Sequence, residues 1–400
     1  MYLNHLSVLN YRSYTQAEIE LEPGFTAFIG HNGQGKTNLV EAVGYLATLS
    51  SHRVSTSAPL VKQGAEFAIV RGNLTRGNRS TLLEVQINPG KSNRARINRS
   101  EVPRARDVIG YLRTVLFAPE DLALVKGDPD VRRRFLDDLL ALLSPRLTGL
   151  RGEYDRILRQ RNALLKSAGA MGSSRGKGRE LPTLDVWDEH LANVGGQLLA
   201  ARLRLVNELR PHVAQAYDEV SGGQGHAHIE YESTLQPHID SATAARFTAP
   251  HPSPAAPGAA ASEIPSESEL AELMRAALVR LRPKELDRGV SLIGPHRDDL
   301  ALHLGDLQAR GYASHGESWS FALALRLASF RLLSAVGDDG EPILILDDVF
   351  AELDVKRRDR LADLVQSARQ VLVTAAVPND VPDQLAGARY DVHLDEVTRV

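Results

Sequence analysis

The sequence predicts an α/β domain whose two parts are separated along the chain by an inserted, mostly helical lobe. Three observations support this prediction: strand-like apolar segments near the N-terminus, helical periodicity in the middle, and helix alternating with strand in the last third. We expect a head made of residues 1–125 and 285–400, which includes an antiparallel β region, and a helical lobe made of residues 126–284.

The expected strands of the head are short and apolar or alternate in polarity. Residues 3–10, 17–21 and 25–29 read as strands, and helical spacing follows at 36–49. The alternating segments "STLLEVQINP" and "ARINRSEV" are separated by turn residues and predict the antiparallel region. Residues 343–346 are continuously apolar, as a buried parallel strand would be.

Long amphipathic stretches predict the inserted lobe. One helix begins near Asp130, which could accept its free amides. Two further helices are expected at 183–220 and 267–281. The stretches 167–182 and 247–266 are rich in Gly, Ser, Ala and Pro and cannot bury a core, so we expect mobile loops there.

Composition limits the possible environments and partners. The 400 residues carry a net charge of −3, so nucleic acid binding would need local basic patches. No apolar run approaches the roughly 18 residues that a membrane span needs. The sequence has no cysteine and no signal-peptide pattern at its start, so we expect a cytoplasmic protein without membrane partners. A solvated loop explains His226 and His228 better than a metal site does.

A phosphate-binding loop is the first motif that carries chemistry. Gly30-x-x-x-x-Gly35-Lys36-Thr37 has the P-loop spacing and lies between an expected strand and an expected helix. Backbone amides would converge on phosphate oxygens, Lys36 would reach the β- and γ-phosphates, and the Thr37 hydroxyl would ligate Mg²⁺. The expected cofactors are therefore ATP and Mg²⁺. The candidate nucleotide-binding residues of this loop are Gly30, His31, Asn32, Gly33, Gln34, Gly35, Lys36, Thr37 and Asn38.

Two carboxylates follow the expected strand at 343–346. Asp347 is suited to hold Mg²⁺, and Asp348 is suited to orient the attacking water. The carboxyl end of a parallel strand is where α/β sheets place their ligands. An Asp-Asp pair could also cap a helix, but its combination with a P-loop favours the nucleotide interpretation. We therefore take Asp348 and Lys36 as the candidate catalytic residues.

A P-loop, an acidic strand end and, between them in sequence, a glycine-bearing polar cluster before a helix resemble the ATP-binding-cassette class of ATPases. Within that class the chain is similar to the RecF family, the recombination mediators among the SMC-like ATPases, over nearly its whole length. The strings that carry this similarity are "YRSY" at 11–14, "GHNGQGKTNLVEA" at 30–42, "LFAPEDLALVKGDPDVRRRFLD" at 116–137, "GPHRDDL" at 294–300, "SHGES" at 314–318 and "ILDDVFAELD" at 345–354.

The resemblance assigns roles to residues outside the P-loop. Ser314 and Gly316 match the signature motif, which binds the nucleotide of the opposite subunit. Residues 351–354 match a loop at the dimer interface. Arg12 matches an arginine near the phosphates, and Glu120 falls near the loop that senses metal and water.

The sequence departs from the family pattern in four places. The signature reads Ser-His-Gly-Glu-Ser, where the class usually has Gly before the key glycine and Gln after it. Glu317 would put a carboxylate near a phosphate, where charge repulsion disfavours it. Ala351 replaces a common serine, and Ala375 and Ala376 stand where a polar switch residue is expected. These departures predict slow hydrolysis more than weak nucleotide binding.

The resemblance implies an ATP-gated homodimer that clamps DNA at single-strand/double-strand junctions. It further implies that RecR and RecO are partners and that RecA is loaded downstream. Arginines within 94–106 and 132–134 are candidate DNA contacts, although such charge runs are more often solvated surface.

Three other classes of protein could carry some of these motifs. The nucleotide-binding subunit of an ABC-type transporter would share the P-loop and the acidic strand, but it would carry a near-consensus signature. A small-molecule phosphotransferase would not need residues 314–318. A structural SMC protein would need heptads over a much longer arm.

Overall fold

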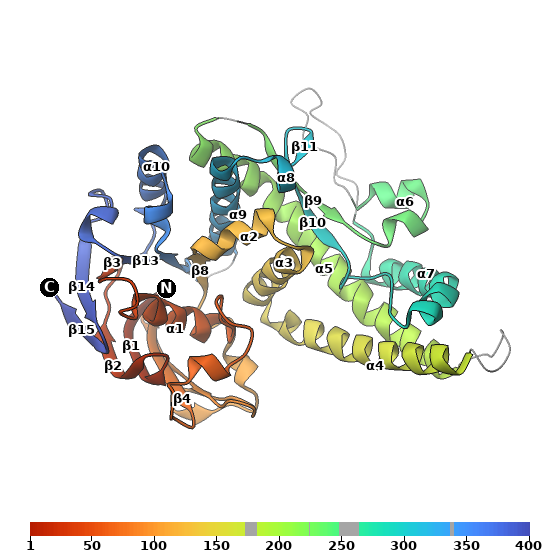
Figure 1. Cartoon of the computed structure of the whole chain (residues 1–400), viewed down its shortest axis with the longest axis horizontal. Coiled ribbons are helices and arrows are strands. Elements are labelled where there is room, and N and C mark those ends of the chain that lie inside the picture. Colours follow the sequence, from red (N-terminus) through yellow and green to blue (C-terminus); the bar gives the residue numbers. More distant parts are fainter. Residues whose placement is uncertain (173–181, 224, 248–263, 337–339) are drawn as a thin grey trace.

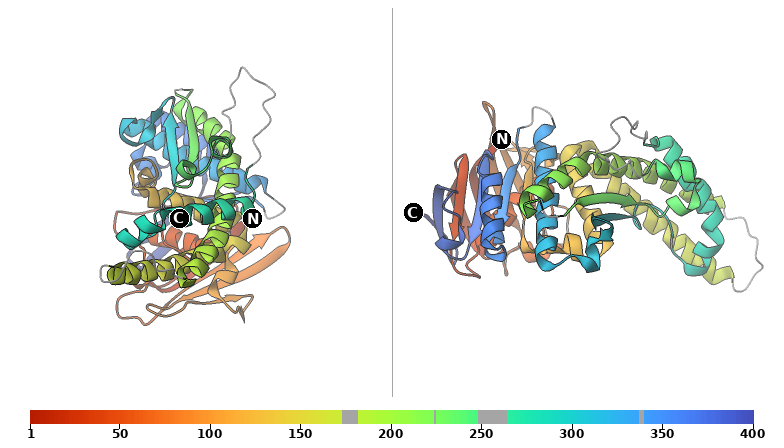
Figure 2. Two further views of the ribbon diagram at one scale, coloured as in Figure 1. Left: turned by 90° about the vertical axis from the view of Figure 1, so that its right-hand side faces the viewer. Right: turned by 90° about the horizontal axis from the view of Figure 1, so that it is seen from above.

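The computed structural model describes residues 1–172, 182–223, 225–247, 264–336 and 340–400. The molecule is elongated, with both chain termini in a two-sheet head and a helical arm extending from it (Figures 1 and 2). The α/β head, its antiparallel region and the helical insertion are as the sequence predicts.

A six-stranded, mostly parallel sheet forms the centre of the head, in the order β15-β14-β3-β13-β12-β8. Its strands are β3 (Gly24–Ile29), β8 (Thr114–Phe117), β12 (Ile343–Asp347), β13 (Gln370–Ala375), β14 (Gly387–His393) and β15 (Glu396–Arg399). All neighbours are parallel except β14 and β15. The N-terminal strand β3 pairs with the C-terminal strand β13, so both ends of the chain build one sheet.

An antiparallel sheet packs beside it, in the order β2-β1-β4-β5-β6-β7. Its strands are β1 (Tyr2–Tyr11), β2 (Tyr14–Glu20), β4 (Ala68–Arg76), β5 (Arg79–Ile87), β6 (Arg94–Ile97) and β7 (Ser100–Glu101). Helix α1 (Lys36–Thr48) contacts both sheets and separates them (Figure 1).

The arm is built around the 40-residue helix α5, which packs against α4, α7 and α9. The α-helices that follow α1 are α2 (Leu122–Lys126), α3 (Pro129–Leu143), α4 (Thr148–Gly172), α5 (Pro182–Ser221), α6 (Ser241–Ala245), α7 (Glu267–Arg288), α8 (Ala309–Tyr312), α9 (His315–Ala335) and α10 (Val355–Val365). A small sheet in the order β11-β10-β9 contains β9 (Ala227–Glu232), β10 (Asp299–Leu304) and β11 (Leu307–Gln308).

Short 3₁₀ helices connect these elements. They are η1 (Ala58–Leu60), η2 (Ala105–Val108), η3 (Pro119–Asp121), η4 (Pro145–Leu147), η5 (Gln236–His238), η6 (Val349–Glu352) and η7 (Pro378–Asp380).

Strand β12, which lies between β13 and β8, separates two hydrophobic cores. Its side chains alternate, so Leu344 and Leu346 pack with the core shared by the arm helices. Ile343 and Ile345 face the core formed by α1 and the antiparallel sheet. Because one core continues from β12 into α5, head and arm share buried surface, and the domain limits at 125 and 285 stay predictions.

The structure differs from the sequence prediction at three helix ends. Residues 167–172 continue α4 instead of forming a loop, and α7 extends past 281 to Arg288. Of the other residues of the two expected loops, 173–181 and 248–263 lie outside the described residues, and Pro182 already belongs to α5. Helix α3 begins at Pro129 with Asp128 as its N-cap, because a proline suits the first helical position. Asp130 therefore lies inside the first turn and does not cap the helix.

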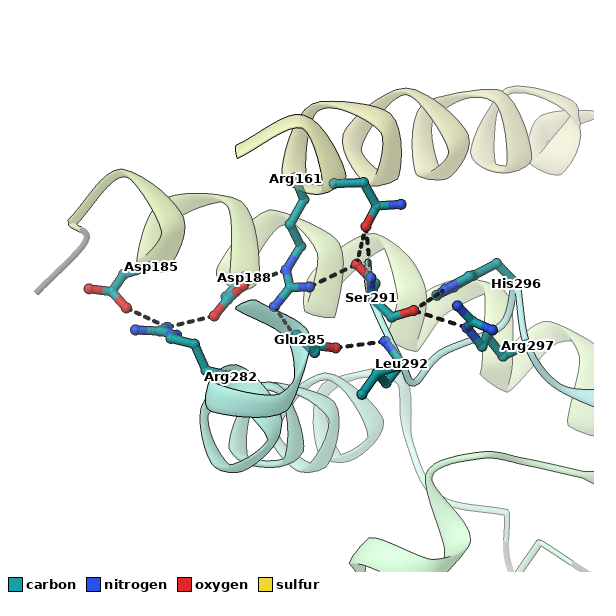
Figure 3. Close-up of polar contacts among 10 residues, drawn as sticks. Arg161, Asp185, Asp188, Arg282, Glu285, Ser291, Leu292, His296 and Arg297 are labelled. Carbon is teal, nitrogen blue, oxygen red and sulfur yellow. Dashed lines mark hydrogen bonds and ion pairs between the residues drawn. The ribbon is translucent and has the colours of Figure 1, made fainter. Parts of the chain in front are cut away.

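A buried ion-pair network joins three helices of the arm (Figure 3). Arg161 of α4 donates to Asp188 of α5 and to Glu285 of α7, each at 2.6 Å. Its third nitrogen donates to the Ser291 hydroxyl at 2.7 Å. The Arg161 side chain is 0% exposed, so these protein hydrogen bonds take the place of the water that would otherwise solvate its charge.

The "GPHRDDL" string connects the arm to the small sheet. The buried Asp298 carboxylate accepts hydrogen bonds from the hydroxyls of Tyr231, Ser233 and Thr234. Burial lowers the pKa of His296 to about 4, which favours a neutral ring. Its Nε2 faces the Ser291 carbonyl oxygen at 3.4 Å and donates to it, so Nδ1 accepts a hydrogen bond from the Tyr154 hydroxyl at 2.7 Å. Through these contacts the string holds the small sheet against the helices of the arm.

We expect Arg161→Leu to destabilise the protein by about 3–5 kcal/mol, because it leaves the buried Glu285 carboxylate without its cation and Asp188 with Arg282 alone. Urea unfolding would measure the change. The matched control is Arg204→Leu, which breaks a half-exposed α5–α7 ion pair with Glu267 and should cost about 1 kcal/mol or less. Equal losses in the two variants would contradict the importance of the buried network.

Candidate nucleotide-binding site

The P-loop lies between the end of β3 and the start of α1. Gly35 is the N-cap of α1 with a left-handed φ of 102°. A Cβ there would lie 2.8 Å from the Tyr14 hydroxyl, and a Cβ at Gly30 would lie 2.3 Å from the Val392 carbonyl oxygen. Glycine is therefore required at both positions, and the loop leaves the first amides of α1 free to bind an anion.

Lys36 closes the loop from the inside. Its side chain is buried, and Nζ lies 3.4 Å from the His31 carbonyl oxygen and 3.5 Å from Asn32 Oδ1. Gln34 faces outward and its side-chain oxygen accepts the backbone N–H of Leu394 at 2.9 Å. The Asn38 amide donates to the Ser13 hydroxyl at 3.1 Å. A buried ammonium among backbone amides fits a phosphate chain.

The structure brings the two predicted metal ligands together from opposite ends of the chain. The Thr37 hydroxyl donates to Asp347 Oδ1 at 2.9 Å. A hydroxyl and a carboxylate are hard oxygen ligands that fit Mg²⁺. In the part of the chain that the structure describes, no group of three or more His, Asp or Glu could hold a metal. A Mg²⁺ ion here would complete its coordination with phosphate and water oxygens.

Thr374 holds the acidic pair and was missed by sequence reasoning. Its hydroxyl donates to Asp347 Oδ1 at 2.6 Å and accepts the backbone N–H of Asp348 at 2.9 Å. It immediately precedes Ala375 and Ala376, where the family resemblance predicts a polar residue. The pairing of β12 with β13 places Thr374 directly beside Asp347. The role of Thr374 therefore follows from the pairing of the two strands, which the sequence does not show.

Asp348 occupies a distinctive position at the site. Its backbone is left-handed, with φ of 51°, which is uncommon for a residue other than glycine. Burial raises the pKa of its carboxyl group, and the nearby charge of Lys36 opposes this effect. The side chain is half-buried beside Asp347, as a group that orients water would need to be.

Arg12 and Glu120 reach the surroundings of the site in different ways. Arg12 donates to both carboxylate oxygens of the buried Glu41, at 2.7 and 2.5 Å, so in this structure its guanidinium is held by α1. Its role at the phosphates stays a prediction. Glu120 lies in η3 directly after β8, the strand beside β12. It lines a cavity of about 330 Å³ together with His52, whose Nε2 is 3.6 Å from Asp347 Oδ2.

The signature cluster begins α9 and lies apart from the P-loop. Ser314 is the N-cap, and its hydroxyl accepts the Glu317 N–H at 3.3 Å. The Glu317 carboxylate accepts the Ser314 N–H at 2.8 Å, and these bonds lower its pKa. Glu317 thus completes a capping box, which accounts for an acid at this position. Figure 1 shows α8, which immediately precedes this cluster, well separated from α1.

Arg357 of α10 connects the signature helix with residues 351–354. It forms an ion pair with Asp354, and its Nε donates to the Ser320 hydroxyl at 3.0 Å. A Cβ at Gly316 would lie 2.7 Å from an Nη atom of Arg357. Gly316 therefore provides the space in which this guanidinium lies.

This contact predicts an interaction between two substitutions. Gly316→Ala should gain up to about 1 kcal/mol of helix propensity, but only where Arg357 has been removed, because the guanidinium otherwise has to move. Urea unfolding of both single variants and the double variant with Arg357→Ala would give a coupling of about 0.5–3 kcal/mol. The exposed Lys356→Ala background is the control. Additive effects with Arg357→Ala would contradict the contact.

Comparisons with known proteins agree with this geometry. The family model described as "RecF/RecN/SMC N terminal domain" matches residues 2–387. DNA replication and repair proteins RecF from Beutenbergia cavernae and Kineococcus radiotolerans are 57% and 58% identical, covering 100% and 98% of this chain and of their own lengths.

Solved structures lead to the same family. A structure of the recombination mediator protein RecF-ATP in the RecFOR pathway has a TM-score of 0.82 and 25% identity, covering 100% of this chain and 97% of its own. An Smc head domain from Pyrococcus furiosus, at a TM-score of 0.52 and 17% identity, shares the fold. The chain belongs to the RecF family of DNA replication and repair proteins.

Proposed function

We propose that this chain is an ATP-gated DNA clamp of recombinational repair. Two subunits bind face to face, and each ATP is held by the P-loop of one subunit and by Ser314 and Gly316 of the other. The dimer holds DNA at single-strand/double-strand junctions and, with RecR and RecO, helps to load RecA. Slow hydrolysis releases it. This role would place the protein in the cytoplasm.

One observation carries the proposal: the P-loop and the acidic strand end lie together in this chain, whereas the signature at the start of α9 lies apart from them. Lys36, Thr37 and Asp347 converge at the edge of the central sheet. The start of α9, capped by Ser314, is exposed and lies away from this cluster in the same chain. A second copy would supply the signature across the bound nucleotide.

Exposed apolar side chains next to these elements support a face-to-face dimer. Isolated surface apolar residues are ordinary, but several around one site are typical of an interface. The residues concerned are Tyr312 (71% exposed), which precedes the signature, Val355 (71%), which follows residues 351–354, Val377 (42%), which follows Ala376, and Leu394 (75%), which bonds to Gln34.

The proposed reaction is hydrolysis of ATP used as a timer. Bound Mg²⁺ would neutralise charge on the β- and γ-phosphates. Lys36 adds a buried positive charge to the same oxygens, and Asp348 orients the attacking water. Ala351, Ala375 and Ala376 provide no polar side chain for this step, which is why we propose a slow rate.

The relatives are named as DNA replication and repair proteins, which favours DNA over the alternative of a transporter partner. Among the described residues no helix is long and apolar enough to cross a membrane.

The prediction that the arginines at 132–134 contact DNA is wrong for two of them. Arg132 is buried against Asp299, and Arg133 donates to the Asp298 carbonyl oxygen at 2.8 Å. These two stabilise the lobe, whereas Arg94 and Arg99 are exposed.

Size-exclusion chromatography with light scattering tests the dimer. The wild type should dimerise with ATP and stay monomeric with ADP or without nucleotide. Lys36→Arg should lose ATP binding and dimerisation, because a planar guanidinium does not replace a buried ammonium in the loop. Ser314→Arg should bind ATP with unchanged affinity, measured with a fluorescent analogue, and stay monomeric.

The matched control for Ser314→Arg is Ser334→Arg, which adds the same charge at the exposed far end of α9. This variant should dimerise like the wild type. A wild type that stays monomeric with ATP would refute the clamp. Loss of ATP binding by Ser314→Arg would show that Ser314 serves its own chain's nucleotide.

A further inference from the structure

We propose that Arg106, Arg146 and Arg156 form a groove that binds the phosphate backbone of duplex DNA. The groove has a volume of about 550 Å³ and is lined by η2, η4 and the first turns of α4. Each arginine comes from a different one of these elements. The inference rests on the proposed DNA clamp and names where one subunit would hold its ligand.

The charges of the groove are not neutralised internally. Among the described residues the side chains of Arg106 and Arg156 have no ion pair or hydrogen bond, and Arg146 bonds only to the Ser144 hydroxyl at 3.2 Å. Glu153 is the one acid among the lining residues. An excess of positive charge in one groove is notable because the whole chain has a net charge of −3. Such a groove attracts a polyanion.

Other arginines of the same region are already paired. Arg96 contacts Glu84 at 3.0 Å, and Arg104 contacts Asp107 at 3.3 Å. Both are exposed, as Arg106 is, so exposure alone does not distinguish them. What distinguishes Arg106 is that its guanidinium faces α4, next to Gly149, instead of an acid.

Two glycines open the floor of the groove. A Cβ at Gly149 would lie 3.3 Å from Nη1 of Arg106, whereas Gly152 has open space where a side chain would be. Glycine inside a helix is unfavourable, by about 1 kcal/mol relative to alanine, and α4 contains both within its first turns. Without side chains here, a phosphate group could approach the helix closely between the arginines.

The charge pattern continues beyond the groove, which favours an extended polymer over a small anion. Arg159 and Lys166 are exposed farther along α4, and a helix rises about 1.5 Å per residue. Together with Arg156 they form a line of cations about 15 Å long. In Figure 1 the antiparallel sheet and α4 lie on the same lower side of the molecule. Phosphate contacts of this kind carry affinity without sequence preference.

Fluorescence anisotropy of a labelled duplex, titrated with the full chain and ATP at several salt concentrations, tests the groove. Each of Arg106→Gln, Arg146→Gln and Arg156→Gln should reduce the slope of log affinity against log salt by about 1, and the triple variant by about 3, for each groove engaged. The matched control is Arg104→Gln, which removes a neighbouring exposed arginine that is paired with Asp107 and should leave the slope unchanged.

The outcomes distinguish a failure of the groove from a failure of the proposed function. A wild type that does not bind duplex would refute the proposed function itself. A wild type that binds while the triple variant keeps the same slope would refute the groove and leave the function intact. ATP affinity and ATP-dependent dimerisation should be unchanged in Arg156→Gln, whose side chain is exposed on α4. Displacement of the duplex by inorganic pyrophosphate at constant ionic strength would instead indicate a small-anion site.

Discussion

The parallel pairing of β3 with β13 is the constraint on which the site depends. It joins residues 24–29 to residues 370–375, so the two ends of a 400-residue chain share one sheet. Because β3 continues into the P-loop and β13 lies beside β12, the phosphate loop and the acidic pair meet at one sheet edge. As a result, the hydroxyls of Thr37 and Thr374 both donate hydrogen bonds to the same Asp347 oxygen.

The arm depends on charge as well as on apolar packing. Arg161 of α4 is surrounded by groups from α5, α7 and the segment after α7. Arg202 of α5 similarly joins Asp137 of α3 to the Pro295 carbonyl oxygen. A buried arginine tolerates few other arrangements, since a shift of one helix would leave its charge without a partner. The "GPHRDDL" string, which helped to identify the family resemblance, provides such partners: the Pro295 carbonyl oxygen for Arg202 and the Asp299 carboxylate for Arg132.

In the signature region, the structure explains why Glu317 is an acid. In the sequence, Glu317 is an acid where a phosphate is expected. In the structure its carboxylate is bonded to the Ser314 N–H, so the helix start carries its own cap. Arg357 then joins this helix to Asp354, which means that the two elements proposed to face the second subunit form one unit. Nucleotide-dependent movement of one of them would therefore move the other.

The sequence by itself determined the local elements and the P-loop chemistry, because strand and helix periodicity and the Gly30–Thr37 spacing depend only on neighbouring residues. It also determined that Asp347 and Asp348 end a buried strand. Only the tertiary structure decided that Thr374 supports them, that Arg12 is held by Glu41 and that Arg132 is internal. Each of these assignments depends on which side chain from a distant segment satisfies a buried polar group. Local sequence does not contain that information, since the same arginine is a surface charge or a buried ion-pair partner according to what packs against it.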